Sequence, residues 1–205
     1  MLAAGGGSRF GGPKQFEPLA GRRVVDWSLD AARSVADHVV LVLPAGRAEG
    51  DWPGADDVVP GGATRSDSAR AGLAVVDADA EVVVIHDAAR PLARPELFAA
   101  VVSALGRGAD GALPGVAVPD TVKEVAGDRV VATLDRAHLV LVQTPQAFRA
   151  DWLRRAHAAG GQATDDAALV EAAGGRVVVV EGDPRNVKIT HPDDLVVAEA
   201  LLGRR

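Results

Sequence analysis

The sequence predicts an α/β fold, a single doubly wound and mostly parallel sheet of the Rossmann-like kind, and two observations carry this prediction. Short valine-rich runs, each next to Gly, Pro or Asp, recur along the chain at residues 38–44, 81–87, 138–145 and 176–183. Stretches with helical patterns lie beside these runs, at residues 24–35, 94–107 and 164–175. Apolar runs without alternation are typical of strands buried on both faces, and strands that alternate with helices build parallel sheets.

The size and charge of the chain restrict its class. A chain of 205 residues can bury one substantial core, so we expect residues 1–205 to form one domain. The formal net charge of -6 argues against a sequence-independent nucleic-acid binder, because such proteins need a cationic surface. The chain has no cysteine, which excludes disulfides and thiolate metal sites. It also has no run of about 20 apolar residues and no signal-like start, so we expect a cytoplasmic protein without a membrane partner.

The first strand is expected to be short, because only Met1–Ala4 precede the glycine-rich stretch GGGSRFGGPKQ. Residues 5–11 have the spacing G-x-G-x-R-x-G, which fits neither the dinucleotide-binding pattern nor the P-loop. Glycines let backbone N–H groups approach a bulky anion, and Arg9 and Lys14 would supply the compensating charge. The stretch therefore predicts a phosphate-binding loop rather than a flexible N-terminus.

A second glycine-containing stretch, PGGATRSDSARAGL at residues 60–73, is expected to be a loop that runs into a helix. Arg65 and Ser68 lie one helical turn apart near the helix start, where anions and nucleobase carbonyls are favoured. Taken alone, this pattern is more often a capped helix than a binding site. The pattern supports a binding site only when it is considered together with the other candidate segments.

The run VVVIHDAARPL at residues 82–92 places His86, Asp87 and Arg90 at the carboxyl end of the most apolar strand. Ligands of open α/β sheets bind at these strand ends, and a carboxylate there can hold Mg²⁺ against phosphate oxygens. We therefore predict Asp87 as a magnesium ligand and His86 as a structural residue. The alternative is that Asp87 caps the turn and pairs with Arg90.

Residues 116–136 break the alternation of strands and helices. Two alternating runs flank the turn signal AGDR, which predicts a β-hairpin with too few apolar residues for the core. We expect it to project as an arm that packs on another surface. Further along, Thr164 stands in an N-cap pattern, and Lys188 is a late cation in an expected short strand.

Together these stretches resemble the 2-C-methyl-D-erythritol 4-phosphate cytidylyltransferases from residue 3 to about residue 195. The resemblance rests on the order and spacing of AAGGGSRFGGPKQF, GGATRSDSARAGL, HDAARPL, PDTVKEV, LDRAHLVLVQTPQAF, ATDDAALVE and GDPRNVKITHPDDL. It implies a Rossmann-like nucleotidyltransferase fold. It also implies transfer of CMP from CTP to 2-C-methyl-D-erythritol 4-phosphate, with release of pyrophosphate, in isoprenoid precursor biosynthesis.

The resemblance also implies a role for individual residues. The catalytic residues would be Arg9, Lys14 and Lys188, and Asp87 would hold Mg²⁺. The nucleotide-binding residues would be Ala3, Ala4, Gly5, Gly6, Gly7, Gly62, Arg65 and Ser68. The polyol phosphate would meet Arg90, Thr121, Arg136 and Thr164. Thr121 and Arg136 would come from the arm of a second subunit, at about residues 117–136, so the resemblance implies a homodimer.

One departure and three alternatives accompany this interpretation. Relatives carry a longer apolar strand before the first alanines, so the short start Met1–Ala4 would anchor the glycine loop less firmly. A cytidylyltransferase for another polyol phosphate, such as ribitol 5-phosphate, would share most of the nucleotide loops. A guanylyltransferase of similar fold is disfavoured by HDAARP. A module that binds CTP without turnover is the alternative from a different class.

Overall fold

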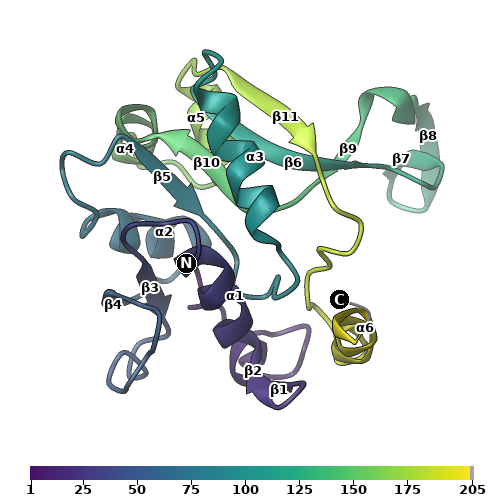
Figure 1. Ribbon diagram of the computed structural model, residues 1–205. Helices are drawn as coiled ribbons and strands as arrows, with labels where there is room; N and C mark the ends of the chain where they lie inside the picture. The colour runs from purple at the N-terminus through teal and green to yellow at the C-terminus, as the bar shows by residue number, and fades with distance from the viewer. Residues whose placement is uncertain (204–205) are drawn as a thin grey trace.

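The computed structural model describes residues 1–203, and its strands and helices confirm the predicted α/β class (Figure 1). The strands are β1 (Pro18–Leu19), β2 (Arg22–Arg23), β3 (Val40–Leu43), β4 (Asp57–Pro60), β5 (Val82–Ile85), β6 (Gly111–Ala117), β7 (Val122–Ala126), β8 (Arg129–Leu134), β9 (Val140–Val142), β10 (Gln146–Arg149) and β11 (Val177–Glu181). The helices are η1 (Lys14–Phe16), α1 (Val24–Arg33), α2 (Arg65–Leu73), α3 (Pro95–Leu105), η2 (Arg136–His138), α4 (Ala150–Ala158), α5 (Asp166–Ala172) and α6 (Asp193–Leu202). Within the described residues, no helix has the length and apolar character needed to cross a membrane.

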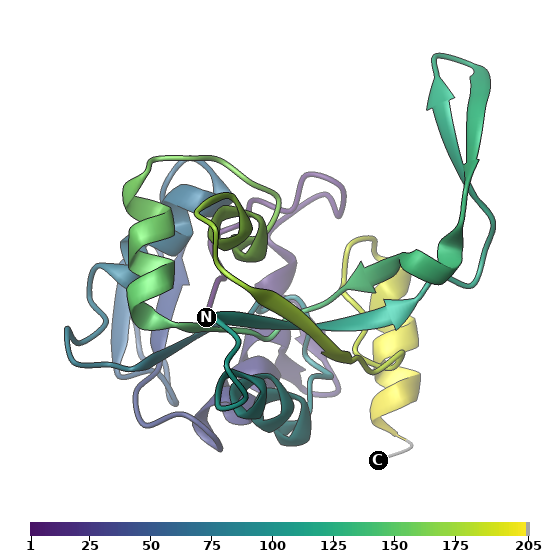
Figure 2. The same ribbon diagram turned by 90° about the horizontal axis from the view of Figure 1, so that it is seen from above.

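The central sheet has the strand order β11-β6-β10-β5, and β9 pairs with β6 off this path. β11 lies parallel to β6, whereas β10 is antiparallel to both of its neighbours. Helices cover both faces of the sheet, with α1 and α3 on one side and α2, α4 and α5 on the other (Figure 2). The doubly wound arrangement is confirmed. The sheet is mixed because the chain reverses its direction through the arm between β6 and β10.

The N-terminal residues join a separate parallel pair, β3 and β4, to the central sheet. Leu2 forms parallel bridges with Val42 of β3 and with Asp87, which lies just after β5. The Ala3 N–H donates to the Val42 carbonyl (2.8 Å), and the Ala88 N–H donates to the Leu2 carbonyl (3.0 Å). The first strand is therefore short, as predicted, yet the backbone that leads into the glycine loop is hydrogen-bonded on both sides.

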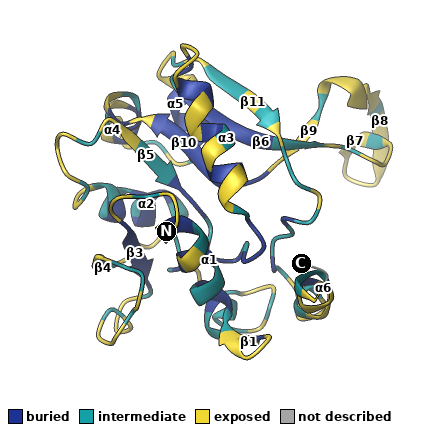
Figure 3. Ribbon diagram, in the orientation of Figure 1, coloured by how far each residue is buried: buried dark blue, intermediate teal, exposed yellow. Residues whose placement is uncertain are grey.

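The burial of the valine-rich strands differs from the prediction (Figure 3). β3 is buried along its whole length, but the expectation of burial on both faces is wrong for β5, β9 and β11. An apolar cavity of about 600 Å³ separates β3 from β5 and leaves Val82 38% exposed. β11 is an edge strand and β9 lies at the base of the arm, so each has fewer neighbours to cover it.

The hairpin predicted at residues 116–136 is present as β7 and β8. These strands pair with Val122 opposite Leu134, and Gly127 turns the chain with a φ of 63°. Figure 2 shows the hairpin projecting from the body of the molecule as an arm. Its large apolar side chains are exposed, among them Val125, Val130, Val131 and Leu134. A solvent-facing arm of this composition offers a surface that another element could cover.

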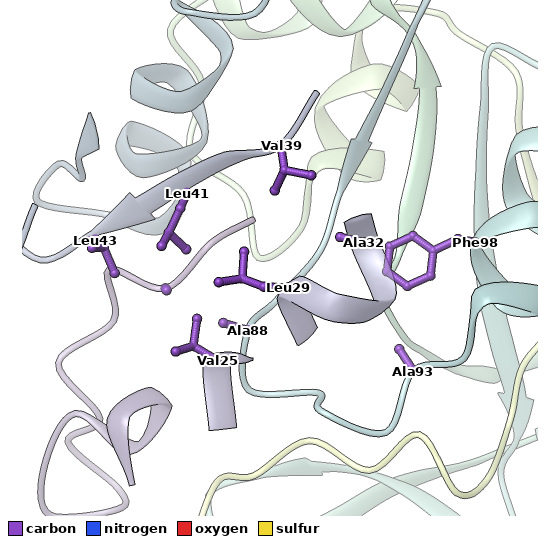
Figure 4. Close-up of a cluster of buried hydrophobic side chains, with 10 residues drawn as sticks. Val25, Leu29, Ala32, Val39, Leu41, Leu43, Ala88, Ala93 and Phe98 are labelled. Carbon is purple, nitrogen blue, oxygen red and sulfur yellow. The ribbon is translucent and has the colours of Figure 1, made fainter. Parts of the chain in front are cut away.

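A buried cluster holds the end of β5 in place (Figure 4). Leu29 of α1, Leu41 of β3 and Phe98 of α3 belong to the same hydrophobic cluster as Ala88, and all four side chains are buried. Burial of each large side chain stabilises the fold by about 1.5–3 kcal/mol. Because Ala88 directly follows Asp87, this cluster also fixes the backbone from which the Asp87 side chain projects.

Candidate active site

The glycine loop folds back on itself around Gly7. Its φ is 67°, and its carbonyl accepts hydrogen bonds from the N–H groups of Phe10 (2.9 Å), Gly11 (2.9 Å) and Gly12 (3.2 Å). A Cβ at this position would lie 1.7 Å from the Gly12 carbonyl oxygen, so only glycine fits. The loop is therefore preformed, with its backbone groups facing a cleft.

Replacing Gly7 by alanine should distort this loop. We expect the KM for CTP, the nucleotide that the sequence resemblance implies, to rise at least about tenfold, because the new Cβ clashes with backbone and the left-handed φ is unfavourable for alanine. Initial rates at varied CTP concentration measure the effect. Gly12→Ala is the matched control, because a Cβ at Gly12 meets no atom within 4 Å. An equal rise of KM in both variants would contradict the prediction.

The second loop is a capped helix start that also lines the cleft. The Thr64 hydroxyl accepts from the Asp67 N–H (3.0 Å), and the Asp67 carboxylate accepts from the Thr64 N–H (3.1 Å). The Gly62 N–H donates to the Ser68 hydroxyl at 3.2 Å. A Cβ on Gly62 would lie 2.3 Å from the Cβ of Asp67, so the loop needs glycine here. The stretch is therefore a capped helix start, and its place in the cleft is compatible with the other interpretation, a binding site.

A cleft of about 380 Å³ brings together segments that are far apart in the sequence. The glycine loop, the start of α2, Asp87 and Lys188 all line it. Asp87 Oδ2 lies 2.5 Å from Lys188 Nζ, and Asp87 Oδ1 lies 3.5 Å from Arg65 Nη2. Next to Lys188, Ile189 is fully buried and donates its N–H to the Ala89 carbonyl at 2.8 Å. This contact holds the Lys188 segment against the end of β5.

The charged side chains of the cleft shift each other's pKa values. Burial favours a raised pKa for Asp87, but Lys188 and Arg65 outweigh it and hold this pKa well below its ordinary value. Burial lowers the pKa of Lys14, and the nearby cations Lys188 and Arg9 lower it further. Such mutual repulsion between cations is relieved by a polyanion. The cleft is therefore suited to binding phosphate groups.

Twelve predicted site residues line this one cleft, namely Ala3, Ala4, Gly5, Gly6, Gly7, Arg9, Lys14, Gly62, Arg65, Ser68, Asp87 and Lys188. The four residues predicted to contact the polyol phosphate do not, namely Arg90, Thr121, Arg136 and Thr164. Thr121 and Arg136 belong to the arm, where Arg136 donates to the Pro119 carbonyl. Thr164 is exposed just before α5.

The structure decides against the alternative interpretation of Arg90 and corrects the expectation for Lys188. Arg90 does not pair with the Asp87 carboxylate but donates to the carbonyls of Asn186 (2.7 Å) and Val142 (3.2 Å). Lys188 lies in a loop and not in a strand, because residues 185–190 extend past β11 without a neighbouring strand. That loop carries Lys188 to Asp87, so the lysine and not the nearby arginine neutralises the carboxylate.

His86 has the structural role that was predicted for it. Its ring lies 5.0 Å from that of Phe98, and its Nδ1 lies 3.0 Å from the Thr144 hydroxyl. Burial lowers the pKa of His86 to about 3, so the ring is neutral near pH 7.

Sequence reasoning missed several residues that support the site. Gln15 donates to the carbonyls of Ala3 (2.6 Å) and Gly5 (3.1 Å) and so fixes the glycine loop. The Thr144 hydroxyl accepts from the Asp87 N–H at 3.0 Å. Asp166, the second aspartate of TDDA, is fully buried beside Arg65. The available signals were positions in the sequence, since Gln15 directly follows Lys14 and Asp166 lies two residues after Thr164.

The donor set restricts how a metal could bind. In the part of the chain that the structure describes, no group of three or more His, Asp or Glu side chains could hold a metal ion. Asp87 is the carboxylate that lines the cleft. Mg²⁺ is commonly bound by one or two carboxylates together with substrate phosphates and water. A single aspartate beside a phosphate-binding loop fits that mode of binding.

A glycine loop, a helix start and converging cations at the strand ends of an α/β sheet define a nucleotidyltransferase-like site. Comparison with known proteins specifies the family. The sequence model of the 2-C-methyl-D-erythritol 4-phosphate cytidylyltransferases matches residues 1–204, and the chain belongs to this family. The Rubrobacter xylanophilus cytidylyltransferase of that name is 44% identical, over 100% of this chain and 94% of the relative. The Rhodococcus jostii enzyme of the same name is 46% identical, over 98% of this chain and 92% of its own.

Solved structures agree with the sequence comparison. The crystal structure of 2-C-methyl-D-erythritol 4-phosphate cytidylyltransferase from Thermus thermophilus superimposes with a TM-score of 0.86 at 39% identity. The superposition covers 100% of this chain and 97% of the Thermus chain. The Rossmann-like nucleotidyltransferase fold predicted from the sequence is thus confirmed.

Proposed function

We propose that this chain transfers CMP from CTP to 2-C-methyl-D-erythritol 4-phosphate, giving 4-diphosphocytidyl-2-C-methyl-D-erythritol and pyrophosphate. The chain belongs to the family of enzymes named for this activity. The observation that carries the proposal is the convergence of Lys14, Lys188 and Asp87 on one cleft beside the glycine loop. Two reactants that both carry phosphate need such a site, because their mutual repulsion must be offset.

The chemistry needs positioning and positive charge more than acid–base groups. A phosphate oxygen of the polyol phosphate attacks the α-phosphorus of CTP in line, that P–O bond forms, and the bond to pyrophosphate breaks. The second pKa of a phosphate monoester is about 6, so the nucleophile is already ionised near neutral pH and needs no general base. Arg9, Lys14 and Lys188 would stabilise the charge that develops around the α-phosphorus.

Asp87 would hold a Mg²⁺ ion in this scheme. The ion would add positive charge at the phosphates of CTP when it is bound. The Asp87 carboxylate is held ionised by Lys188 and Arg65, which supports this role. A CTP-dependent enzyme works where CTP is available, so we also propose a cytoplasmic location.

Pyrophosphate release tests the proposed function directly. The protein is incubated with CTP, Mg²⁺ and either 2-C-methyl-D-erythritol 4-phosphate or ribitol 5-phosphate. We expect release with the first acceptor and little with the second. Release that is faster with ribitol 5-phosphate would instead support the other polyol phosphate. CTP binding without pyrophosphate from either acceptor would support a non-catalytic CTP-binding module.

The acceptor end of the site is proposed to lie between two subunits. Thr121 and Arg136 are on the projecting arm and do not line the cleft of their own chain. The exposed apolar side chains of the arm would be covered if it packed on a second copy. We therefore propose a homodimer in which each arm brings these two residues to the partner's cleft. Light scattering of the purified protein measures this oligomeric state.

Replacing Arg136 by alanine should raise the KM for the polyol phosphate about tenfold or more, with little change in the KM for CTP, because a charge-assisted contact to phosphate is lost. Equal increases in both KM values would contradict an arm that contacts only the acceptor.

Mixing variants tests whether the arm acts on the other subunit. Arg136→Ala protomers are mixed with Lys188→Ala protomers, and the subunits are allowed to exchange. Each mixed dimer then has one cleft with an intact lysine and an intact arm. At polyol phosphate concentrations well below the raised KM, roughly a quarter of all sites should therefore turn over as in the unsubstituted protein at equal mixing. Activity no higher than that of the two variants measured apart would show that the arm serves its own chain.

A further inference from the structure

A chain of alternating charges runs from the cleft into the core behind it. Lys188 pairs with Asp87, and Asp87 pairs in turn with Arg65. Arg65 Nη1 lies 2.7 Å from Asp166 Oδ2, and Asp166 Oδ1 lies 3.0 Å from His157 Nε2. The last two residues do not line the cleft, so none of the chemistry described above uses them.

Arg65 is shared between two carboxylates with very different surroundings. The Asp87 side chain lines the cleft, whereas the Asp166 side chain is fully buried at the start of α5. Burial favours a lower pKa for Arg65, but Asp87 and Asp166 together raise this pKa above its usual value. The guanidinium is a planar fork, so holding one nitrogen on Asp166 sets the direction in which the other points. The buried carboxylate therefore orients Arg65 toward the cleft.

His157 completes the arrangement from the side of α4. An ionised carboxylate only accepts hydrogen bonds, so the imidazole donates through Nε2 to Asp166. His157 Nδ1 is buried and has no hydrogen-bond partner among the described residues. A buried ring with one unpaired nitrogen is destabilising unless its other contact compensates. That contact holds Oδ1 of Asp166, whereas Arg65 contacts Oδ2.

We propose that Asp166 and His157 are a buried pair of positioning residues for Arg65, and that this pair sets the affinity of the cleft for CTP. The proposal rests on the proposed function and on the role that the sequence resemblance implies for Arg65, which lines the cleft, in binding the nucleotide. Without Asp166, the guanidinium loses the contact that fixes its direction, so it turns freely and Arg65 no longer holds one orientation toward the nucleotide. The acceptor end of the site contains neither residue and should be affected little.

Substitutions that keep shape but remove one contact test the pair. Asp166→Asn should raise the KM for CTP about tenfold and change the KM for the polyol phosphate less than about twofold. His157→Leu should raise the KM for CTP about threefold, and His157→Gln should restore it, because the glutamine amide can donate from the position of Nε2. Val170→Ala is the control, because it removes buried apolar atoms from the same helix α5 and leaves every member of the charged chain in place.

A second measurement does not depend on CTP turnover. The side-chain NMR signals of Arg65, assigned by loss of a signal in Arg65→Lys, should show a guanidinium with hindered rotation in the unsubstituted protein and in Val170→Ala. Asp166→Asn should lose this hindrance. Unchanged hindrance in Asp166→Asn, or an equal rise in the KM for CTP in Val170→Ala, would overturn the proposal. An unsubstituted protein that does not bind CTP would count against the proposed function, and the NMR comparison would still decide the positioning role.

Discussion

Replacing Lys188 by alanine should abolish measurable turnover while CTP binding falls only modestly. The ammonium group lies in the cleft beside Asp87, where it can reach the charge that grows around the α-phosphorus during transfer. Removing one preorganised donor of this kind lowers kcat by about 10²–10³-fold. The phosphates of CTP keep the glycine loop, Arg9 and Lys14, so ground-state binding loses only one of several contacts.

Two measurements separate these effects. Pyrophosphate release gives kcat, and calorimetric titration with CTP gives the dissociation constant. Arg107→Ala is a control that removes an exposed cation after α3, outside the cleft. Turnover of Lys188→Ala near that of the unsubstituted protein would remove the lysine from the mechanism. A loss of CTP binding with kcat unchanged would mean that Lys188 binds the ground state as strongly as the transition state.

The two glycine loops that line the cleft could be predicted from the sequence because their signals are local. Gly7 is required by its own φ and by contact with Gly12, five residues away. Thr64 and Asp67 cap a helix within a single turn. Such features can be predicted from a short stretch of sequence. The turn at Gly127, which closes the hairpin of the arm, is predictable for the same reason.

The central part of the sheet left weaker signals. β6 contains two glycines and a proline, which disfavour a strand, yet it lies between β11 and β10. Its glycines are explained by close neighbours, since a Cβ on Gly111 would lie 2.8 Å from the Phe148 ring and one on Gly115 would lie 2.7 Å from Val179. These contacts arise only when the strands pair, so no short window of sequence contains them.

The ion pairs of the cleft were also beyond local prediction. Arg90 is three residues from Asp87, and Lys188 is 101 residues away, yet Lys188 forms the ion pair. The loop after β11 decides which cation pairs with Asp87, because the carbonyls of Asn186 and Val142 accept hydrogen bonds from the Arg90 guanidinium. In the same way, the burial of Asp166 depends on α4 and α2 packing around the start of α5.

Replacing Asp87 by asparagine should lower kcat/KM at least about 100-fold and remove the dependence of activity on Mg²⁺, because the carboxylate proposed to hold the ion is gone. The amide keeps the shape of the side chain and leaves Lys188 and Arg65 without their shared anion. CTP binding without Mg²⁺ should therefore be unchanged or tighter, since a negative charge that repels phosphates is lost while the cations remain.

Calorimetric titrations with CTP, with and without Mg²⁺, measure both effects, and Asp37→Asn serves as an exposed control outside the cleft. An Asp87→Asn protein that still requires the same Mg²⁺ concentration, or that binds CTP more weakly without the ion, would show that Asp87 acts by holding its cationic neighbours rather than a metal.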